Sequence, residues 1–228
     1  MKFFYSAGVM SYGEGYWWHR FFNFPKLPFV TKTLTLNPKK GNKYLILPVF
    51  NSVFNKVSLD NIGIYNFIKK YKVSDIPRTI SIAGTDKHIR QLVDLIKYFL
   101  PKEDSIELNY SCPNVKSFNN TWIPRSHGKI YLKLNYKQDP YLYDLSKIKG
   151  IRLNSIPLGF CGGSGKIAQK KNWAFIEKFN KEGLNVSGCS IQNYEDIRRL
   201  SDIGCTEIGI GSIILTRPKF VENLENLI

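Results

Sequence analysis

The chain has 228 residues, of which 43% are hydrophobic and 14% aromatic, enough for one sizeable core. Its net charge of +15 favours anionic partners such as phosphate groups, acidic substrates or nucleic acid. No apolar run approaches the roughly 20 residues of a membrane span and the N-terminus has no signal-peptide pattern, so we expect a cytoplasmic protein without a membrane anchor.

Strand-like apolar runs alternate with helix-like segments along the chain. The pattern predicts strands at residues 29–36, 79–82, 105–108, 130–134, 151–153, 184–187 and 207–210, and helices at 87–99, 172–179 and 194–203. This alternation implies a parallel sheet. It recurs often enough to predict one α/β domain over residues 1–228, a compact (β/α)8 TIM barrel. In such barrels the chemistry lies at the C-terminal ends of the strands.

The four cysteines and three histidines are scattered, without a Cys-x-x-Cys pair. We therefore expect no metal or iron–sulfur site built by this chain alone, and free thiols that fit a reducing cytoplasm. The lysines are also spread over the chain rather than gathered in a basic tail. A generally lysine-rich composition therefore explains the positive charge better than binding to nucleic acid does.

The segment from residue 107 to 115 is the most informative stretch. A short strand runs into a turn in which Cys112 and Pro113 lie between Asn109 and Asn114. Asparagines donate and accept hydrogen bonds without carrying charge. The combination indicates a thiol for acid–base work on a planar, amide-rich ligand, although a free cysteine is more often simply buried.

Further blocks follow in a fixed order along most of the chain. They are Ser6-Ala7-Gly8, Thr31-Lys32-Thr33, residues 55–63, residues 81–84, the Cys112 segment, Lys133-Leu134, Asn154-Ser155, residues 162–165 and Gly211-Ser212. In this order they resemble a shortened class 1 dihydroorotate dehydrogenase, a flavin mononucleotide (FMN) enzyme on a (β/α)8 barrel. The brevity and residue usage fit a minimal, virally or phage-encoded version.

The resemblance implies oxidation of dihydroorotate to orotate in pyrimidine biosynthesis. Cys112 would take the proton from C5, the flavin would take the hydride from C6, and Lys32 would assist catalysis. The residues implied in substrate binding are Lys32, Asn55, Asn109, Asn114, Asn154 and Ser155.

The resemblance also implies an FMN site. Lys32 and Lys133 would lie near the flavin, where positive charge stabilises its reduced form. Glycine-rich turns would cradle the phosphate. The implied FMN-binding residues are Ala7, Gly8, Lys32, Thr33, Asn109, Lys133, Gly162, Gly163, Gly188, Cys189, Ser190, Gly211 and Ser212.

Three positions depart from the family's glycines. Cys189-Ser190 replace a Gly-Gly pair, Cys161 replaces the first glycine of a late loop, and Ser58 replaces the glycine of the substrate loop. Where a positive φ is required, a Cβ atom at these positions would force a different backbone path.

Several alternatives remain open. Electrons would leave to fumarate in a homodimer, or to a partner subunit that carries FAD and an iron–sulfur cluster. The Asn109 to Pro113 spacing also fits a tRNA dihydrouridine synthase, but no arginine follows closely after Lys133 and no histidine follows His127. A catalytically impaired flavin-binding remnant is the third possibility.

Overall fold

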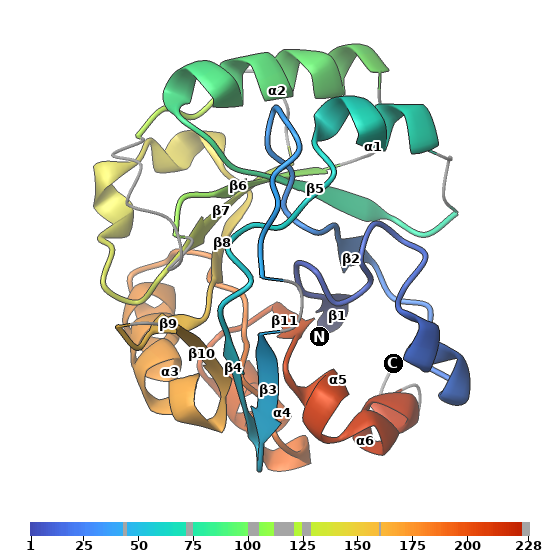
Figure 1. Cartoon of the computed structure of the whole chain (residues 1–228). Coiled ribbons are helices and arrows are strands. Elements are labelled where there is room, and N and C mark those ends of the chain that lie inside the picture. The colour runs from blue at the N-terminus through green and yellow to red at the C-terminus, as the bar shows by residue number, and fades with distance from the viewer. Residues whose placement is uncertain are drawn as a thin grey trace.

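The computed structural model describes residues 1–42, 45–71, 75–99, 105–111, 121–124, 129–159 and 161–224. Within these ranges, a seven-stranded, entirely parallel sheet curls around a central space (Figure 1). Its order is β11 (Glu207–Ile210), β1 (Lys2–Tyr5), β2 (Phe29–Val30), β5 (Arg78–Ile82), β6 (Ser105–Asn109), β7 (Ile130–Leu134) and β8 (Gly150–Leu153). The predicted α/β class and parallel sheet are confirmed.

The predicted closed barrel is found only in part. Residues 184–187 form no regular strand. Instead, single parallel bridges join Val186 to Ile151 of β8 and Gly188 to Ile208 of β11. The segment changes its hydrogen-bonding partner within two residues, which is too short a pairing on either side for a ladder. The described fold is therefore a curled parallel sheet of TIM-barrel type.

Helices cover the outside of this sheet (Figure 1). They are α1 (Ile64–Lys70), α2 (Asp86–Phe99), α3 (Lys166–Lys181), α4 (Tyr194–Asp202), α5 (Ile213–Thr216) and α6 (Pro218–Glu222), with 3-10 turns η1 (Trp17–Phe21), η2 (Pro140–Leu142) and η3 (Leu145–Lys147). All three predicted helices are confirmed. Helix α3 begins six residues before its predicted start, because its first turn is mainly polar and gives no apolar period.

A second, antiparallel sheet was not predicted. Its order is β3 (Ile46–Val49), β4 (Ser52–Asn55), β10 (Gly162–Gly165) and β9 (Ile156–Pro157). Gly162 and Gly163 thus lie in a strand and face Asn55 and Phe54, so their assignment to a loop was wrong. The strand predicted at residues 29–36 is also shorter, since only β2 and a bridge from Leu34 to Ile82 form there.

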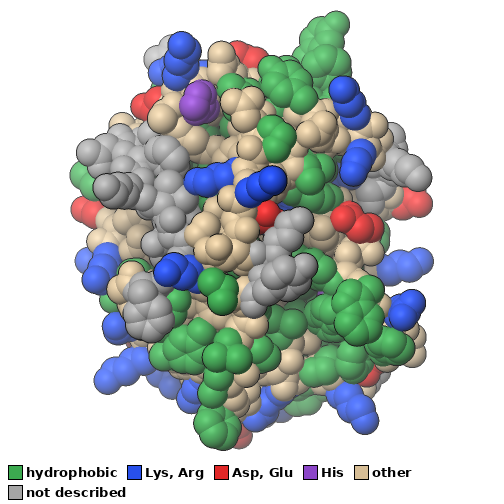
Figure 2. Space-filling model, viewed as in Figure 1, with side chains coloured by type: hydrophobic (Ala, Val, Ile, Leu, Met, Phe, Trp, Pro, Cys, Tyr) green, Lys and Arg blue, Asp and Glu red, His purple; other side chains and the backbone are tan. Residues whose placement is uncertain are grey.

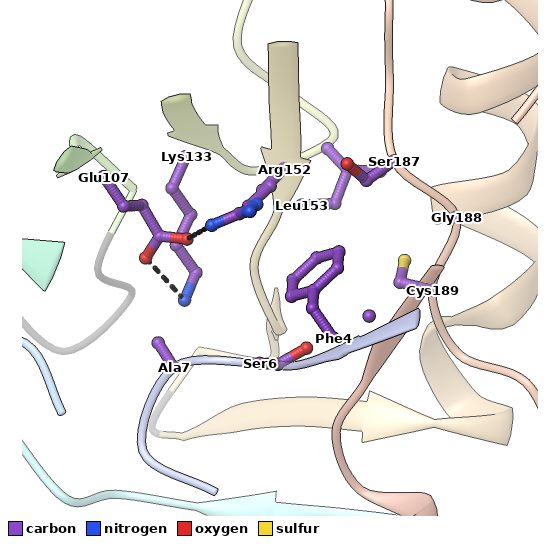
Figure 3. Close-up of a pocket in the computed structure, with 11 residues that line it drawn as sticks. Phe4, Ser6, Ala7, Glu107, Lys133, Arg152, Leu153, Ser187, Gly188 and Cys189 are labelled. Carbon is purple, nitrogen blue, oxygen red and sulfur yellow. Dashed lines mark ion pairs between the residues drawn. The ribbon is translucent and has the colours of Figure 1, made fainter. Parts of the chain in front are cut away.

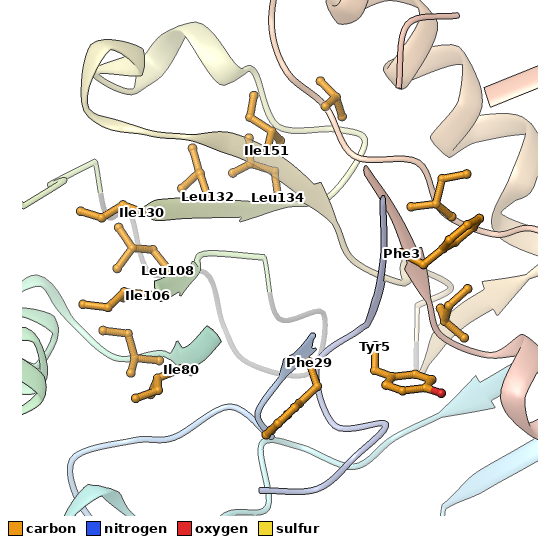
Figure 4. Close-up of a cluster of buried hydrophobic side chains, with 14 of the residues drawn as sticks. Phe3, Tyr5, Phe29, Ile80, Ile106, Leu108, Ile130, Leu132, Leu134 and Ile151 are labelled. Carbon is orange, nitrogen blue, oxygen red and sulfur yellow. The ribbon is translucent and has the colours of Figure 1, made fainter. Parts of the chain in front are cut away.

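The main core lies between the sheet and the helices. Side chains on this outer face of the sheet are almost completely buried, with exposed fractions of 0–1%: Ile80, Ile82, Ile106, Leu108, Ile130, Leu132, Leu134 and Ile151 (Figure 4). Helix α2 adds Ile89, Leu92, Val93 and Ile96 to the same cluster. Because side chains alternate along a strand, the intervening residues face the central space.

The positive charge is not gathered in one place on the face shown in Figure 2, where Lys and Arg side chains are separated by other residues. Large apolar side chains are exposed on η1 and around the β3–β4 hairpin, including Trp17 at 72% and Phe50 at 95%. The face of the molecule shown in Figure 2 therefore lacks the single basic patch that a nucleic-acid surface needs.

Candidate active site

The ends of the parallel strands bring the predicted polar residues together. Asn109 at the end of β6 pairs in register with Lys133 of β7, and Asn154 and Ser155 directly follow β8. Carboxyl ends of parallel strands share one edge of a sheet. The strand register therefore brings these polar residues to the C-terminal edge of the sheet, where sequence analysis predicted the site.

Four polar side chains, which lie at or just beyond the ends of β2, β6 and β8, form an amide cluster at this edge. Asn109 donates from Nδ2 to Thr33 Oγ1 at 3.1 Å, and its Oδ1 accepts from the Ser111 amide at 3.4 Å. Asn154 donates from Nδ2 to the Ser111 Oγ and to its carbonyl, both at 3.2 Å. Asn109, Thr33 and Asn154, which lie far apart in the sequence, are thus held in one hydrogen-bonded group.

A second amide contact extends the cluster toward the small sheet. Asn55, at the end of β4, donates from Nδ2 to Ser155 Oγ at 3.4 Å. Strand β4 is fixed there because β10 pairs along its whole length. Both residues were predicted as substrate ligands, and the fold places them side by side.

Cys112 and Asn114 lie outside the described residues, so their predicted roles stay predictions. Ser111 immediately precedes Cys112, is 4% exposed, and contacts both Asn109 and Asn154. The chain therefore enters the Cys112 segment from the amide cluster.

Lys32 is held by an ion pair that the sequence reasoning missed. Its Nζ lies 2.7 Å from Asp60 Oδ2, and Asp60 Oδ1 accepts from the Gly41 amide at 3.1 Å. Asp60 belongs to the 55–63 block, so the signal was the one carboxylate in that loop. The pair fixes the ammonium group next to that loop.

A cluster of buried charges fills the inner side of the sheet below Lys133 (Figure 3). Lys133 Nζ lies 3.5 Å from Glu107 Oε1, and Arg152 Nη1 lies 3.6 Å from Glu107 Oε2. The Arg152 guanidinium also lies over the rings of Phe4, at 4.1 Å, and Tyr131, at 3.6 Å. Buried charges are retained when they are paired in this way.

Sequence reasoning identified Lys133 but neither Glu107 nor Arg152. The signal was present as charged residues at alternate positions in apolar strands. Alternation alone is equally compatible with a solvated face, so it does not reveal that these charges meet inside the sheet.

A cavity of about 20 Å³, the space of roughly one water molecule, joins the charge cluster to the strand ends. Its lining includes Ser6, Ala7, Lys133, Gly188 and Cys189, all but Ser6 of them predicted FMN contacts (Figure 3). Arg152 Nε and Nη1 lie beside it without a hydrogen-bond partner in the described part of the chain. The predicted contacts from β1, β7 and the 188–189 segment therefore meet around one space.

Two turns at this edge have the geometry of an anion cradle. Gly188 bridges to Ile208 of β11, and the turn that contains Gly211 and Ser212 directly follows that strand. The backbone amides of Ser190 and Ser212 donate no hydrogen bond within the described ranges. Backbone amides without an internal partner are typical of phosphate-binding turns, and Ser190 has the left-handed backbone of such a turn, so the residues present fit a flavin phosphate.

Two of the residues that stand in place of the family's glycines have a left-handed backbone. Ser190 has φ 62° and Ser58 has φ 57°, followed by Leu59 at φ 57°. This conformation costs about 1–2 kcal/mol for a residue with a Cβ atom. Ser58 and Ser190 thus adopt a backbone conformation that glycine favours, and the predicted change of backbone path stays a prediction.

Cys189 is a neutral thiol in this setting. Burial raises its pKa to about 11, although Asn172 donates to its Sγ at 3.5 Å. Its carbonyl accepts from Trp173 Nε1 at 2.8 Å, which anchors the turn to α3. Cys189 therefore contributes backbone rather than a nucleophile.

In the part of the chain that the structure describes, no three His, Cys, Asp or Glu side chains are grouped to hold a metal ion. Among the same residues, no helix combines the length and apolar character needed to cross a membrane.

The chain is similar to known proteins over most of its length. The profile of the family described as dihydroorotate dehydrogenase matches residues 2–132. The catalytic subunit of dihydroorotate dehydrogenase B (NAD(+)) from Thermotoga maritima is 32% identical over 230 residues, which cover 85% of this chain and 84% of that protein.

Other relatives with the same name match over shorter stretches. The protein from Endomicrobium trichonymphae is 36% identical over 94 residues, 38% of this chain and 30% of that protein. The one from Brachyspira hyodysenteriae is 36% identical over 120 residues, 49% of this chain and 38% of that protein. With more than half of its length matched by the family profile and most of it by the Thermotoga relative, the chain belongs to the dihydroorotate dehydrogenase family of oxidoreductases.

Proposed function

We propose that this protein oxidises dihydroorotate to orotate with FMN as its cofactor, as a step in pyrimidine biosynthesis. The observation that carries the proposal is the amide cluster of Asn109, Ser111 and Asn154 beside Lys133 at one edge of the sheet. A planar ring with alternating N–H and C=O groups needs such a set of neutral donors and acceptors. A site of this kind rejects ligands that leave its polar groups unpaired.

FMN would lie at the open end of the curled sheet. The free amides of Ser190 and Ser212 would bind its phosphate, and Ala7, Gly8, Thr33 and Gly188 would line its path. Lys133 would place positive charge near the ring. When bound, FMN accepts the hydride that no side chain can accept. Gly162 and Gly163 remain proposed contacts, now from strand β10 rather than from a loop.

Cys112 is the proposed base that removes the C5 proton. The chain leads to it from Ser111 in the amide cluster. Lys32, held by Asp60, would face the anionic end of the substrate together with Asn55 and Ser155. Asn114 would complete the set of amides.

The full domain would be a single (β/α)8 barrel over residues 1–228. In that barrel residues 185–188 supply the eighth strand, for which the bridges to β8 and β11 are the support. We propose a cytoplasmic location, since nothing in the described helices calls for a membrane.

The relatives' names bear on the electron acceptor. They are described as catalytic subunits of an NAD(+) enzyme, which favours transfer to a partner subunit over transfer to fumarate. We therefore replace fumarate with a partner subunit as the proposed acceptor. A homodimer of the catalytic chain is compatible with that assembly.

The decisive experiment is anaerobic addition of dihydroorotate to the FMN-loaded protein. We expect the yellow flavin absorbance to bleach, and the Cys112→Ala variant to bind FMN without bleaching. Cys205→Ala controls for the loss of a buried thiol, because Cys205 packs in the apolar core behind Gly188. A wild-type protein that takes up no FMN would contradict the proposal. Bleaching by NADPH with action on tRNA would replace it.

A further inference from the structure

A line of buried side chains connects the charge cluster to the amide cluster. Ser81 Oγ donates to Glu107 Oε1 at 2.9 Å, and Thr33 Oγ1 lies 2.9 Å from Ser81 Oγ. Asn109 Nδ2 then donates to Thr33 Oγ1 at 3.1 Å. The exposed fractions of Glu107, Ser81, Thr33 and Asn109 are 1%, 0%, 7% and 4%, so water does not compete for these bonds.

The carboxylate gives this line a single direction. Glu107 forms ion pairs with Lys133 and Arg152, and a carboxylate can only accept hydrogen bonds. Ser81 has one hydroxyl hydrogen and uses it on Glu107. Thr33 must therefore donate to Ser81, which leaves its oxygen as the acceptor for Asn109.

The direction continues into the second amide. With the Asn109 NH2 group turned to Thr33, its Oδ1 accepts from the Ser111 amide and hydroxyl at 3.4 and 3.5 Å. The Ser111 hydroxyl then accepts from Asn154 Nδ2 at 3.2 Å, and Asn154 Oδ1 accepts from the Ser155 amide at 2.8 Å. Both ends of each amide are thus bonded to protein groups.

This matters because the two ends of an asparagine amide have nearly the same shape but opposite hydrogen-bonding character. A flipped amide would present an acceptor where a ligand carbonyl needs a donor, or a donor where a ligand N–H needs an acceptor. The cost of a buried mismatch is far larger than the gain from one ordinary hydrogen bond.

We propose that Glu107 fixes the orientation of the Asn109 amide through the Ser81 and Thr33 hydroxyls, while the Ser111 carbonyl and the Ser155 amide hold Asn154 beside it. Glu107 and Ser81 are thus positioning residues of the substrate site, connected to Asn109 through three and two hydrogen bonds respectively. This inference rests on the proposed function only for the identity of the ligand. The hydrogen-bond relay (Glu107, Ser81, Thr33, Asn109, Ser111 and Asn154) is a property of the protein alone.

The test removes one hydroxyl from the relay. Ser81→Ala breaks it, whereas Thr79→Val removes a buried hydroxyl two residues earlier on the same strand. The Thr79 side chain makes no hydrogen bond with the described residues, so this variant is the matched control. Glu107→Gln is the second variant, because a carboxamide can donate as well as accept and so leaves the direction unfixed.

Two readouts separate this inference from the proposed function. The first is the side-chain amide signal of Asn109 in protein labelled with 15N-asparagine, identified by its loss in Asn109→Asp. We expect it to shift and to exchange faster with solvent in Ser81→Ala and Glu107→Gln but not in Thr79→Val. This measurement needs neither flavin nor substrate.

The second readout is the binding of orotate to the FMN-loaded protein, followed by the flavin absorbance. We expect Ser81→Ala to weaken binding about tenfold, because the amide is no longer held in one orientation. If the wild-type protein binds no FMN, the proposed function fails while the amide signal still tests the relay. An Asn109 signal that responds alike in Ser81→Ala and Thr79→Val would overturn the inference, as would unchanged orotate binding.

Discussion

The two faces of the curled sheet are equally buried but built from different chemistry. On the outer face Ile106 and Leu108 are 1% and 0% exposed and pack among other apolar side chains. On the inner face Glu107, between them in the sequence, is 1% exposed and meets Lys133, Arg152 and Ser81. Burial on the outer face stabilises directly through the hydrophobic effect. Burial on the inner face is tolerable only while every charge is paired.

This contrast separates the side chains that stabilise the fold from those that connect to the candidate site. Outer side chains need only the right volume and apolar surface. Inner side chains depend on specific partners, and they connect to the strand ends where the candidate site lies. Three changes test this division, beginning with the largest expected effect.

Replacing Glu107 by Leu should have the largest effect on stability. Among the described residues, the change removes the carboxylate that pairs with Lys133 and leaves Arg152 paired with Glu207 alone, at 3.9 Å. We expect the free energy of unfolding in urea to fall by about 3–5 kcal/mol, the usual consequence of breaking a buried ion pair. Adding Arg152→Met should recover part of the loss, because one orphaned charge is then removed. A double variant no more stable than Glu107→Leu would contradict this account.

Leu108→Ala tests the neighbouring position on the outer face. The cavity left behind should lower the free energy of unfolding by about 2–5 kcal/mol. The dissociation constant of FMN, measured by fluorescence titration of the folded variant, should not change. Weakened FMN binding comparable to that of Glu107→Leu would show that the two faces are not independent.

The smallest expected effect concerns alkaline stability and compares one thiol from each face. Burial raises the pKa of Cys189, which lines the inner cavity, to about 11, and that of Cys205, in the outer core, to about 12. An unfolded thiol titrates near 8.5. Above that pH the unfolded chain loses these protons first, so stability is fully present below about pH 8.5 and declines as pH rises toward the folded pKa.

Urea unfolding at successive pH values measures this decline. Each thiol contributes a slope of at most about 1.4 kcal/mol per pH unit. Cys189→Ser should remove the inner share, and Cys205→Ser the outer one. If the free energy of unfolding declines with pH at the same slope in the wild type and in Cys189→Ser, burial does not raise the pKa of the Cys189 thiol as described.

Some of the fold followed from local pattern. The periods of β5, β6, β7 and α2 each lie within one short stretch, and these elements were predicted within about two residues. Asn109, Lys133 and Asn154 were placed at strand ends for the same reason, since a strand's end is visible where its apolar run stops. Their meeting at one edge required only that the sheet be parallel.

Contacts between distant residues were not available from pattern. Val53 and Ser164, which pair β4 with β10, are 111 residues apart, and nothing local in a Gly-Gly-Ser-Gly run indicates a strand. Lys32 and Asp60 were read separately for the same reason. The left-handed Ser190 also reads locally as an ordinary serine, because tertiary contacts alone impose its backbone conformation.

The sequence by itself determined the parallel α/β class, the apolar outer face and the polar residues at the strand ends, because each depends on spacing along one strand or helix. The tertiary structure decided which of those polar residues share hydrogen bonds, and it brought Glu107, Ser81, Thr33 and Asn109 into one line. The physical reason is that a hydrogen bond depends on the distance and direction between two groups. Those are set by strand register and sheet curvature, which no single segment of the chain contains.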